Sequence, residues 1–187
     1  MRKHFVKEYE NTPAINKKGK ITTEVVYKGD YYCNDNINKK QQLRYYILLF
    51  SVMILAFLMN GILESESSKI IYIALPYMCC FLPFAYIIMG IYRLWKNPDK
   101  MEKIQKERSY DRLLRSSVGI LVLSILSIIG SVIYLINNSK DISILIEGRF
   151  LLLNGIISCI AFFLIKYTGK NIKLLTIKKQ KNISNNV

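Results

Sequence analysis

The stretch that most constrains the fold runs from Ile70 to Tyr92, because its 23 residues include no carboxylate, amine or guanidinium side chain. A helix needs about 20 apolar residues to cross the ~30 Å hydrocarbon core of a bilayer. The run is long enough and apolar enough to meet that need, and it therefore predicts a transmembrane helix.

One side of this predicted helix differs from the rest. At about 100° per residue, six of its residues fall within one narrow arc, while Ile, Leu, Phe and Met fill most of the remaining circumference. Two of the six are prolines, and the carbonyls that prolines leave unbonded are best tolerated against other helices or trapped water. We therefore expect the stripe to face the bundle or to line a pore. Its members are Tyr72, Pro76, Cys79, Pro83, Tyr86 and Gly90.

Three other runs repeat this pattern, in a chain that is 51% hydrophobic with a mean hydropathy of +0.20. The predicted fold is an all-α integral membrane protein, with four transmembrane helices arranged as two antiparallel hairpins. The first ten residues contain no apolar core of the length found in signal peptides, so no cleaved leader is expected. The spans are predicted at about 45–63, 70–92, 116–136 and 150–168.

The charges predict the orientation. Residues 1–44 carry ten Lys or Arg against five acids, residues 93–115 carry eight against four, and residues 166–187 carry six against none. Taken together, the connections at 64–69 and 137–149 have a slight excess of acids, four against three Lys or Arg. Because cytoplasmic loops are enriched in Lys and Arg, both termini and the central loop are expected in the cytoplasm. The formal net charge of +14 then reflects topology and attraction to anionic inner-leaflet lipid, and nucleic-acid binding is not expected.

Three polar segments flank the predicted four-helix transmembrane domain of residues 43–168. The first is an N-terminal arm of residues 1–42, which begins as loop or disorder through NTPAINKKGK. Alternation in ITTEVVY, followed by KGD as a turn before Tyr31 and Tyr32, then predicts a small β-hairpin. The hairpin either offers an edge to a partner or lies on the protein's own loops.

The other two segments are the central loop at 93–115 and the basic tail at 169–187, which is expected to fray into solvent. In the loop, Asn97 as a cap and Pro98 at the first helical position predict a helix running toward the third span. That helix is either a solvated extension of the span or a basic surface that binds lipid headgroups or a partner.

The third and fourth spans each have a face of small or polar residues. Such residues let neighbouring membrane helices approach closely, and an asparagine within a span usually needs a hydrogen-bond partner across the bundle. We predict that these faces pack inside the bundle or line a pore. They comprise Ser117, Ser124, Ser127 and Ser131 in the third span, and Asn154 and Ser158 in the fourth.

Residues that support chemistry are missing from the four apolar cores, which contain no Asp, Glu, His, Lys or Arg. That absence argues against a proton-coupled antiporter. Glu147 lies at the outer edge of the fourth span, and the single histidine, His4, lies in the N-terminal arm. The adjacent Cys79 and Cys80 point about 100° apart on a helix, which is unsuitable for a catalytic disulfide. We expect no enzyme activity, metal site or cofactor.

The leading hypothesis is therefore a non-enzymatic accessory or regulatory subunit that packs against a membrane partner or forms a homo-oligomer. The alternative is a small transporter or pore for an uncharged or apolar molecule, with the stripe and the polar faces as its lining. A membrane enzyme acting on lipid has little support because no acid–base pair is visible. The abundance of Ile, Lys, Asn and Tyr suggests a bacterial cell membrane as the location.

Overall fold

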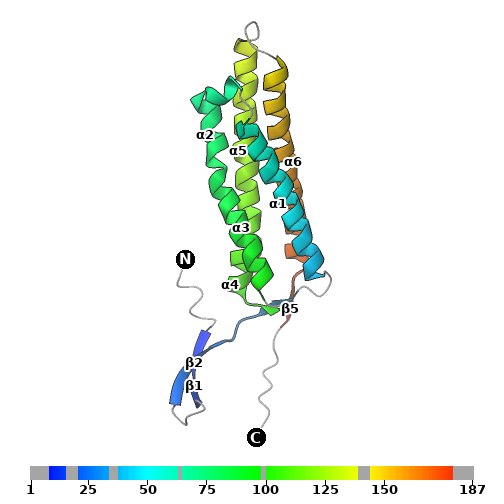
Figure 1. Cartoon of the computed structure of the whole chain (residues 1–187). Coiled ribbons are helices and arrows are strands. Elements are labelled where there is room, and N and C mark those ends of the chain that lie inside the picture. The colour runs from blue at the N-terminus through cyan, green and yellow to red at the C-terminus, as the bar shows by residue number, and fades with distance from the viewer. Residues whose placement is uncertain are drawn as a thin grey trace.

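The structure is a computed structural model that describes residues 9–15, 21–33, 38–62, 65–97, 100–138 and 144–178. Its main body is a bundle of long helices, with a few short strands gathered at one end, as Figure 1 shows. We call this end of the bundle the strand end and the opposite one the far end. The helices are α1 (Lys39–Ile62), α2 (Ile71–Cys79), α3 (Phe81–Lys96), α4 (Lys103–Lys106), α5 (Arg112–Asn137) and α6 (Ile144–Leu174).

In the described part of the chain, four helical stretches are long and apolar enough to cross a membrane, which confirms the predicted helices and is the composition expected of a membrane protein. The stretches exceed the predicted spans chiefly because polar residues continue the helices at the strand end. α4 and α5, for example, are joined by the π-helical turn Glu107–Asp111 and form one helix of 35 residues from Lys103 to Asn137. The helix predicted in the central loop is thus present and runs directly into the third span.

The second stretch is divided at Cys80, where α2 ends and α3 begins. Pro76 and Pro83 have no backbone N–H, so each removes one hydrogen bond from the helix. At the junction the Cys80 N–H donates to the Tyr77 carbonyl over 3.1 Å, as in a tighter helical turn, and its thiol donates to the Pro76 carbonyl over 3.5 Å. The single predicted helix is therefore two helices with a break between them.

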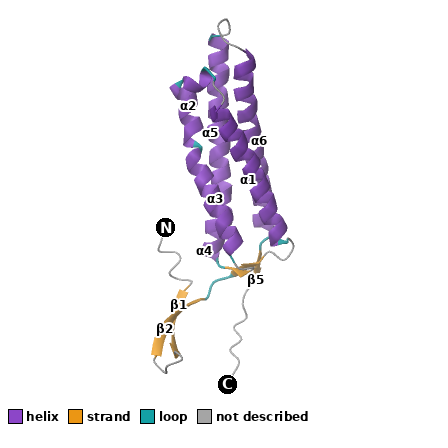
Figure 2. Cartoon of the chain, in the orientation of Figure 1, coloured by secondary structure: helices purple, strands orange, loops and turns teal. Residues whose placement is uncertain are grey.

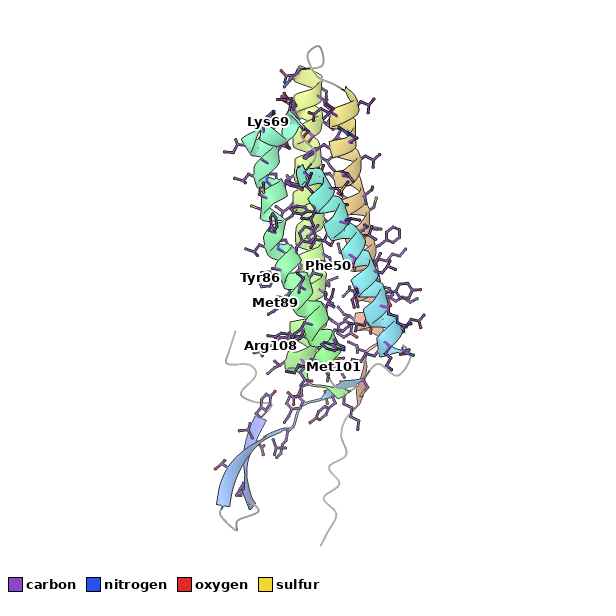
Figure 3. All side chains as sticks on the ribbon, in the orientation of Figure 1. Phe50, Lys69, Tyr86, Met89, Met101 and Arg108 are labelled. Atoms are coloured by element: carbon purple, nitrogen blue, oxygen red, sulfur yellow. The ribbon has the colours of Figure 1, made fainter. Side chains whose placement is uncertain are left out.

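The packing order follows from which helices touch. α6 packs along both α5 and α1, α5 also packs on α2 and α3, and α1 meets α3 over a short stretch. In Figure 1, α5 and α6 run side by side along the length of the bundle, while α1 crosses obliquely and ends below their far ends. Figure 3 places Phe50 between α1 and α3, and its ring lies 6.1 Å from that of Phe84. The largest fully buried apolar residues include Met53, Ile73, Ile87, Leu113, Ile120, Ile157 and Leu164.

The first pair of strands forms a hairpin, but with a different partner from the predicted one. Strand β2 (Ile21–Tyr27) pairs antiparallel with β1 (Tyr9–Ile15), in a register from Tyr9 opposite Tyr27 to Ile15 opposite Ile21. The sequence had predicted that residues 21–27 pair with Tyr31 and Tyr32 and that β1 lies in a loop. The strand β1 was not predicted because it contains Pro13 and several polar residues, which are uncommon in strands. Proline is tolerated here because β1 lies at the edge of the sheet.

A second sheet joins the three polar segments of the chain. Strand β3 (Tyr31–Cys33) lies between β4 (Lys100–Met101) and β5 (Thr176–Lys178), and both pairings are antiparallel. The start of the tail is therefore part of a sheet rather than frayed, and residues 179–187 lie outside the described part of the chain.

The helix cap predicted in the central loop also lies elsewhere. Asn97 ends α3 instead of starting a helix, and Pro98 is outside the described residues. The cap is Glu102, whose side chain and that of Gln105 bind each other's backbone N–H groups. Just before this cap, Lys100 and Met101 form β4, whose pairing with β3 no local pattern reveals.

Candidate functional site

Buried polar side chains follow the interior of the bundle from one end to the other, while large apolar side chains cover its outside. An apolar exterior of this extent suits lipid, so the chemistry of the molecule is concentrated inside. The buried set includes Gln42 and Asn60 on α1, Ser117, Ser124, Ser127 and Ser131 on α5, and Glu147, Asn154, Thr168 and Asn171 on α6.

The serine face of α5 lies buried, as the sequence had led us to expect, and it contacts two neighbours. Ser127 donates to the Ile73 carbonyl of α2 over 3.4 Å, while Ser131 donates to the Ser127 carbonyl of its own helix over 2.9 Å. Ser158 of α6 lies 2.8 Å from the hydroxyl of Ser124. The structure therefore brings together the polar faces of the third and fourth spans.

Glycines allow the second stretch to approach α5 closely. A Cβ on Gly130 would lie 3.1 Å from Ile73 and 3.3 Å from the ring of Tyr72. A Cβ on Gly90 would lie 2.8 Å from Cγ of Leu113, closer than two such carbons can come. The two contacts place α2 and α3 against α5 at both ends of the stretch.

The stripe predicted on residues 70–92 is divided between the interior and the outer surface. Pro76, Pro83 and Gly90 are buried, whereas Cys79 is exposed and Tyr72 and Tyr86 are 51% and 43% exposed. This placement corrects the predicted facing of those three residues. The prediction placed bulky side chains toward lipid. The buried positions keep helical spacing on both sides of Cys80, but this buried face is turned away from the centre of the stripe, and bulky residues fill it. Those residues include Ile73, Tyr77, Phe84 and Ile87.

The two exposed tyrosines still have neighbours. The Tyr72 ring covers Gly130, and the guanidinium carbon of Arg112 lies 5.5 Å from the centre of the Tyr86 ring. Figure 3 shows Tyr86 and Met89 on the outer side of α3. Cys79 lines an open apolar depression of about 770 Å³ beside the helix break, together with residues such as Leu75, Leu82 and Leu123. The tyrosines and Cys79 thus border the outer face of the bundle.

At the far end, Glu147 fastens α6 to the connection between α1 and α2. Its carboxylate is buried and accepts hydrogen bonds from the backbone N–H groups of Glu66, at 2.8 Å, and Ser67, at 3.2 Å. It also accepts one from the Ser67 hydroxyl. These donors satisfy the buried charge without a cation. The sequence placed Glu147 at the membrane edge, but a contact eighty residues away leaves no local signal.

At the strand end, five polar side chains meet between α1, α6 and the π-helical turn. The Tyr46 hydroxyl donates to Thr168 over 3.1 Å and accepts from the Asn171 amide over 3.3 Å. Tyr110 donates to the side-chain oxygen of Gln42 over 3.0 Å. Nε2 of Gln42 and Oδ1 of Asn171 have no hydrogen-bond partner in the described part of the chain. Sequence reasoning missed this cluster. The structure places it beside a π-helical turn, and such turns often occur at functional sites.

Asn60 and Asn154 lie in the interior between these two ends, and both are 1% exposed. Asn154 donates to the Phe150 carbonyl of its own helix over 3.2 Å. Neither polar atom of the Asn60 side chain has a hydrogen-bond partner among the described residues. The structure thus buries an asparagine two residues before the end of α1.

Acidic, cysteine and histidine side chains do not cluster in threes at any point of the described ranges, so these residues form no candidate metal site there. Comparison with protein-family models, curated proteins and solved structures finds no match for this chain. The functional argument therefore starts from the geometry of the chain itself.

Proposed function

We propose that the protein is a multi-pass integral protein of the cell membrane that acts without catalysis, as an accessory or regulatory subunit of a membrane partner. The four apolar helices would span the bilayer, with the strand end in the cytoplasm. Two features support this orientation. The basic segments before α1, between α3 and α5 and after α6 all belong to the strand end, and the connection at 64–69 belongs to the far end. The basic strand end would also meet anionic lipid headgroups.

The observation that carries the proposal is the β1–β2 hairpin, which extends from the strand end away from the bundle (Figure 2). It is attached near its base, where the Tyr9 hydroxyl donates to Glu102 over 2.8 Å and the Lys103 N–H donates to the Tyr27 hydroxyl over 3.4 Å. Val25 and Val26 are 65% and 42% exposed. A two-stranded hairpin is marginally stable in water, and a third strand from a partner would extend its sheet and place side chains beside Val25 on one face and Val26 on the other.

The position of the hairpin also suggests how a partner could influence the bundle. Strand β3 follows the hairpin directly and pairs with β4, between α3 and α4, and with β5, after α6. In addition, the Lys39 ammonium at the start of α1 donates to the Asn97 carbonyl at the end of α3. A partner that pulls on the hairpin would therefore act on the bundle through the pairing of β3 with β4 and β5, which are joined to α3, α4 and α6 by short connections.

The test is site-specific photo-crosslinking in native membranes, with a photoreactive residue at Val25. A matched control carries the same residue at Lys40, which is exposed at the strand end but outside the hairpin. We expect one discrete adduct from Val25 and none from Lys40. The substitution Val25→Asp should abolish co-purification of that partner, whereas Thr23→Asp, two residues earlier on the same strand, should reduce it less. A monomer with no adduct at Val25 contradicts the proposal.

A second candidate function is a small transporter or pore for an uncharged molecule, and the buried polar interior favours it. The polar cluster at the strand end and the asparagines toward the far end are separated by apolar residues, including Met53 and Ala161. A helix break lies beside this interior, where α2 and α3 could move relative to each other. The test is uptake of small neutral solutes into vesicles containing the protein. Unchanged uptake for Asn154→Ala would count against this function.

A further inference from the structure

We propose that the bundle binds a small uncharged molecule carrying both a hydrogen-bond donor and an acceptor, with Asn60 as its main contact. The inference rests on the interior of the bundle and is independent of the accessory role of the hairpin.

Asn60 has the largest unmet hydrogen-bonding capacity in the structure. Among the described residues, four buried side-chain polar atoms lack a partner, and two of them are Nδ2 and Oδ1 of Asn60. The side chain is 1% exposed, so bulk water does not reach it. A buried amide without partners is strongly unfavourable in an apolar interior, and leucine could occupy the same position without that cost. The presence of an asparagine at this position is explained if another molecule forms hydrogen bonds with its side chain.

The register between α1 and α6 places Asn60 level with Asn154. The two helices are antiparallel, and Tyr46 meets Thr168 near the strand end. Fourteen residues onward along α1 is Asn60, and fourteen residues back along α6 is Asn154. Both steps cover about 21 Å at 1.5 Å per residue.

The neighbouring polar groups already have partners, so the capacity of Asn60 is not met from within the bundle. The Tyr77 hydroxyl donates to the Phe57 carbonyl, one turn before Asn60, and lies 3.1 Å from where a Cβ on Gly61 would be. Asn154 donates to the Phe150 carbonyl of its own helix. These hydroxyl and carbonyl oxygens can accept further hydrogen bonds from a bound molecule.

The chemistry of the site selects a neutral ligand. Asn60 offers two N–H donors and one oxygen acceptor, and a primary amide can bond to both sides of it at once. Water is the smallest molecule with the same capacity. A charged ligand would have no counter-ion, because the one charged residue among the buried polar side chains is Glu147, whose carboxylate already accepts three hydrogen bonds.

The experiment is NMR of the full chain, labelled with ¹⁵N-asparagine, in phospholipid nanodiscs. The side-chain amide signal of Asn60 is assigned by its loss in Asn60→Leu, or in Asn60→Ala if the leucine variant does not fold. We expect one of two results. Either acetamide shifts this signal saturably, with at least tenfold weaker binding in the variant, or the signal shows a magnetisation-transfer peak to a bound water. The first result identifies a small amide site and the second a water site.

The Asn138 amide, which is exposed and donates to the Tyr134 carbonyl over 3.2 Å, is the internal control and should show no saturable shift. Absence of both the acetamide shift and the water peak at Asn60 overturns the proposal. A second measurement is the midpoint of unfolding in sodium dodecyl sulfate. Asn60→Leu should lower it if the amide is bonded to a ligand, and a raised midpoint would show an unbonded amide and also overturn the proposal.

Discussion

The hydroxyl of Ser158 lies 2.8 Å from that of Ser124, across the interface between the two longest helical stretches of the protein. It also lies 2.9 Å from the Asn154 carbonyl of its own helix, so its one proton is shared between the two acceptors. Ser124 in turn donates to the Leu121 carbonyl over 3.0 Å. The pair joins α5 and α6 where both are surrounded by apolar side chains. Hydrogen bonds of this kind contribute modestly to helix association, and close packing contributes the rest.

The Ser124–Ser158 pair predicts that small and large substitutions at the α5–α6 interface lower the stability by different amounts. Ser124→Ala should lower the free energy of unfolding by about 0.5–1 kcal/mol, because one interhelical hydrogen bond is lost while the packing is kept. Ser124→Leu should cost about 1–3 kcal/mol or more, since a buried small residue is replaced by a large one. The measurement is unfolding in mixed detergent micelles, followed by circular dichroism. Ser51→Leu, at an exposed position of α1, is the control and should have little effect. If Ser124→Leu and Ser51→Leu destabilised the protein equally, the burial of Ser124 between α5 and α6 would be contradicted.

Gly90 supplies the sharpest test of the packing between α3 and α5. Gly90→Ala should destabilise the protein by about 1–3 kcal/mol, because the added carbon would lie 2.8 Å from Cγ of the buried Leu113 and force it to move. The matched control is Gly155→Ala on α6, where no atom lies within 4 Å of the new carbon. That change should be neutral or stabilise the helix by about 0.5–1 kcal/mol, as alanine does relative to glycine. A stabilising Gly90→Ala would disprove the close approach.

The contacts of Glu147 predict that this one side chain holds the start of α6 against the connection between α1 and α2. Glu147→Ala leaves the buried Ser67 hydroxyl and two backbone N–H groups without their acceptor, at a cost of about 1–3 kcal/mol for each unsatisfied group that water cannot reach. Hydrogen exchange at Glu66 and Ser67 should accelerate at the same time. The control is Lys69→Ala, which removes an exposed ion pair with Glu66 and should change stability by less than about 1 kcal/mol. Unchanged exchange in the Glu147 variant would contradict the contact.

Local patterns predict the helices of this protein well and their interior faces less well. Long uncharged runs predict helices because a membrane span must be apolar along its whole length, and this can be read from composition alone. The serines at 124, 127 and 131 are buried as their shared face implies. The facing of Tyr72 and Tyr86 was predicted wrongly because small and polar residues were assigned to the interior, whereas bulky residues such as Ile73 fill it.

Contacts between distant segments account for the remaining differences. Tyr32 pairs with Met101 and Ile177, which lie more than sixty residues farther along the chain, so neither partner strand has a local signature. The burial of Asn60 likewise depends on the antiparallel register of α1 and α6, which is fixed by contacts such as that of Tyr46 with Thr168. A single sequence shows that these residues are polar, but it does not show which neighbour each one meets.

Tyr46 provides a last prediction, with its neighbour in the sequence as control. Tyr46→Phe removes the donor to Thr168 and the acceptor for the Asn171 amide, while the aromatic ring remains in the core. Because both partners are fully buried, the variant should lose about 1–3 kcal/mol of unfolding free energy. Tyr45→Phe should change stability little, since Tyr45 is half exposed and its packing against Tyr167 involves only the ring. Chemical unfolding of both variants in mixed micelles measures the difference. If Tyr46→Phe and Tyr45→Phe unfold at the same midpoint, the hydroxyl of Tyr46 contributes nothing to the cluster, and Thr168 and Asn171 must satisfy each other or bind water instead.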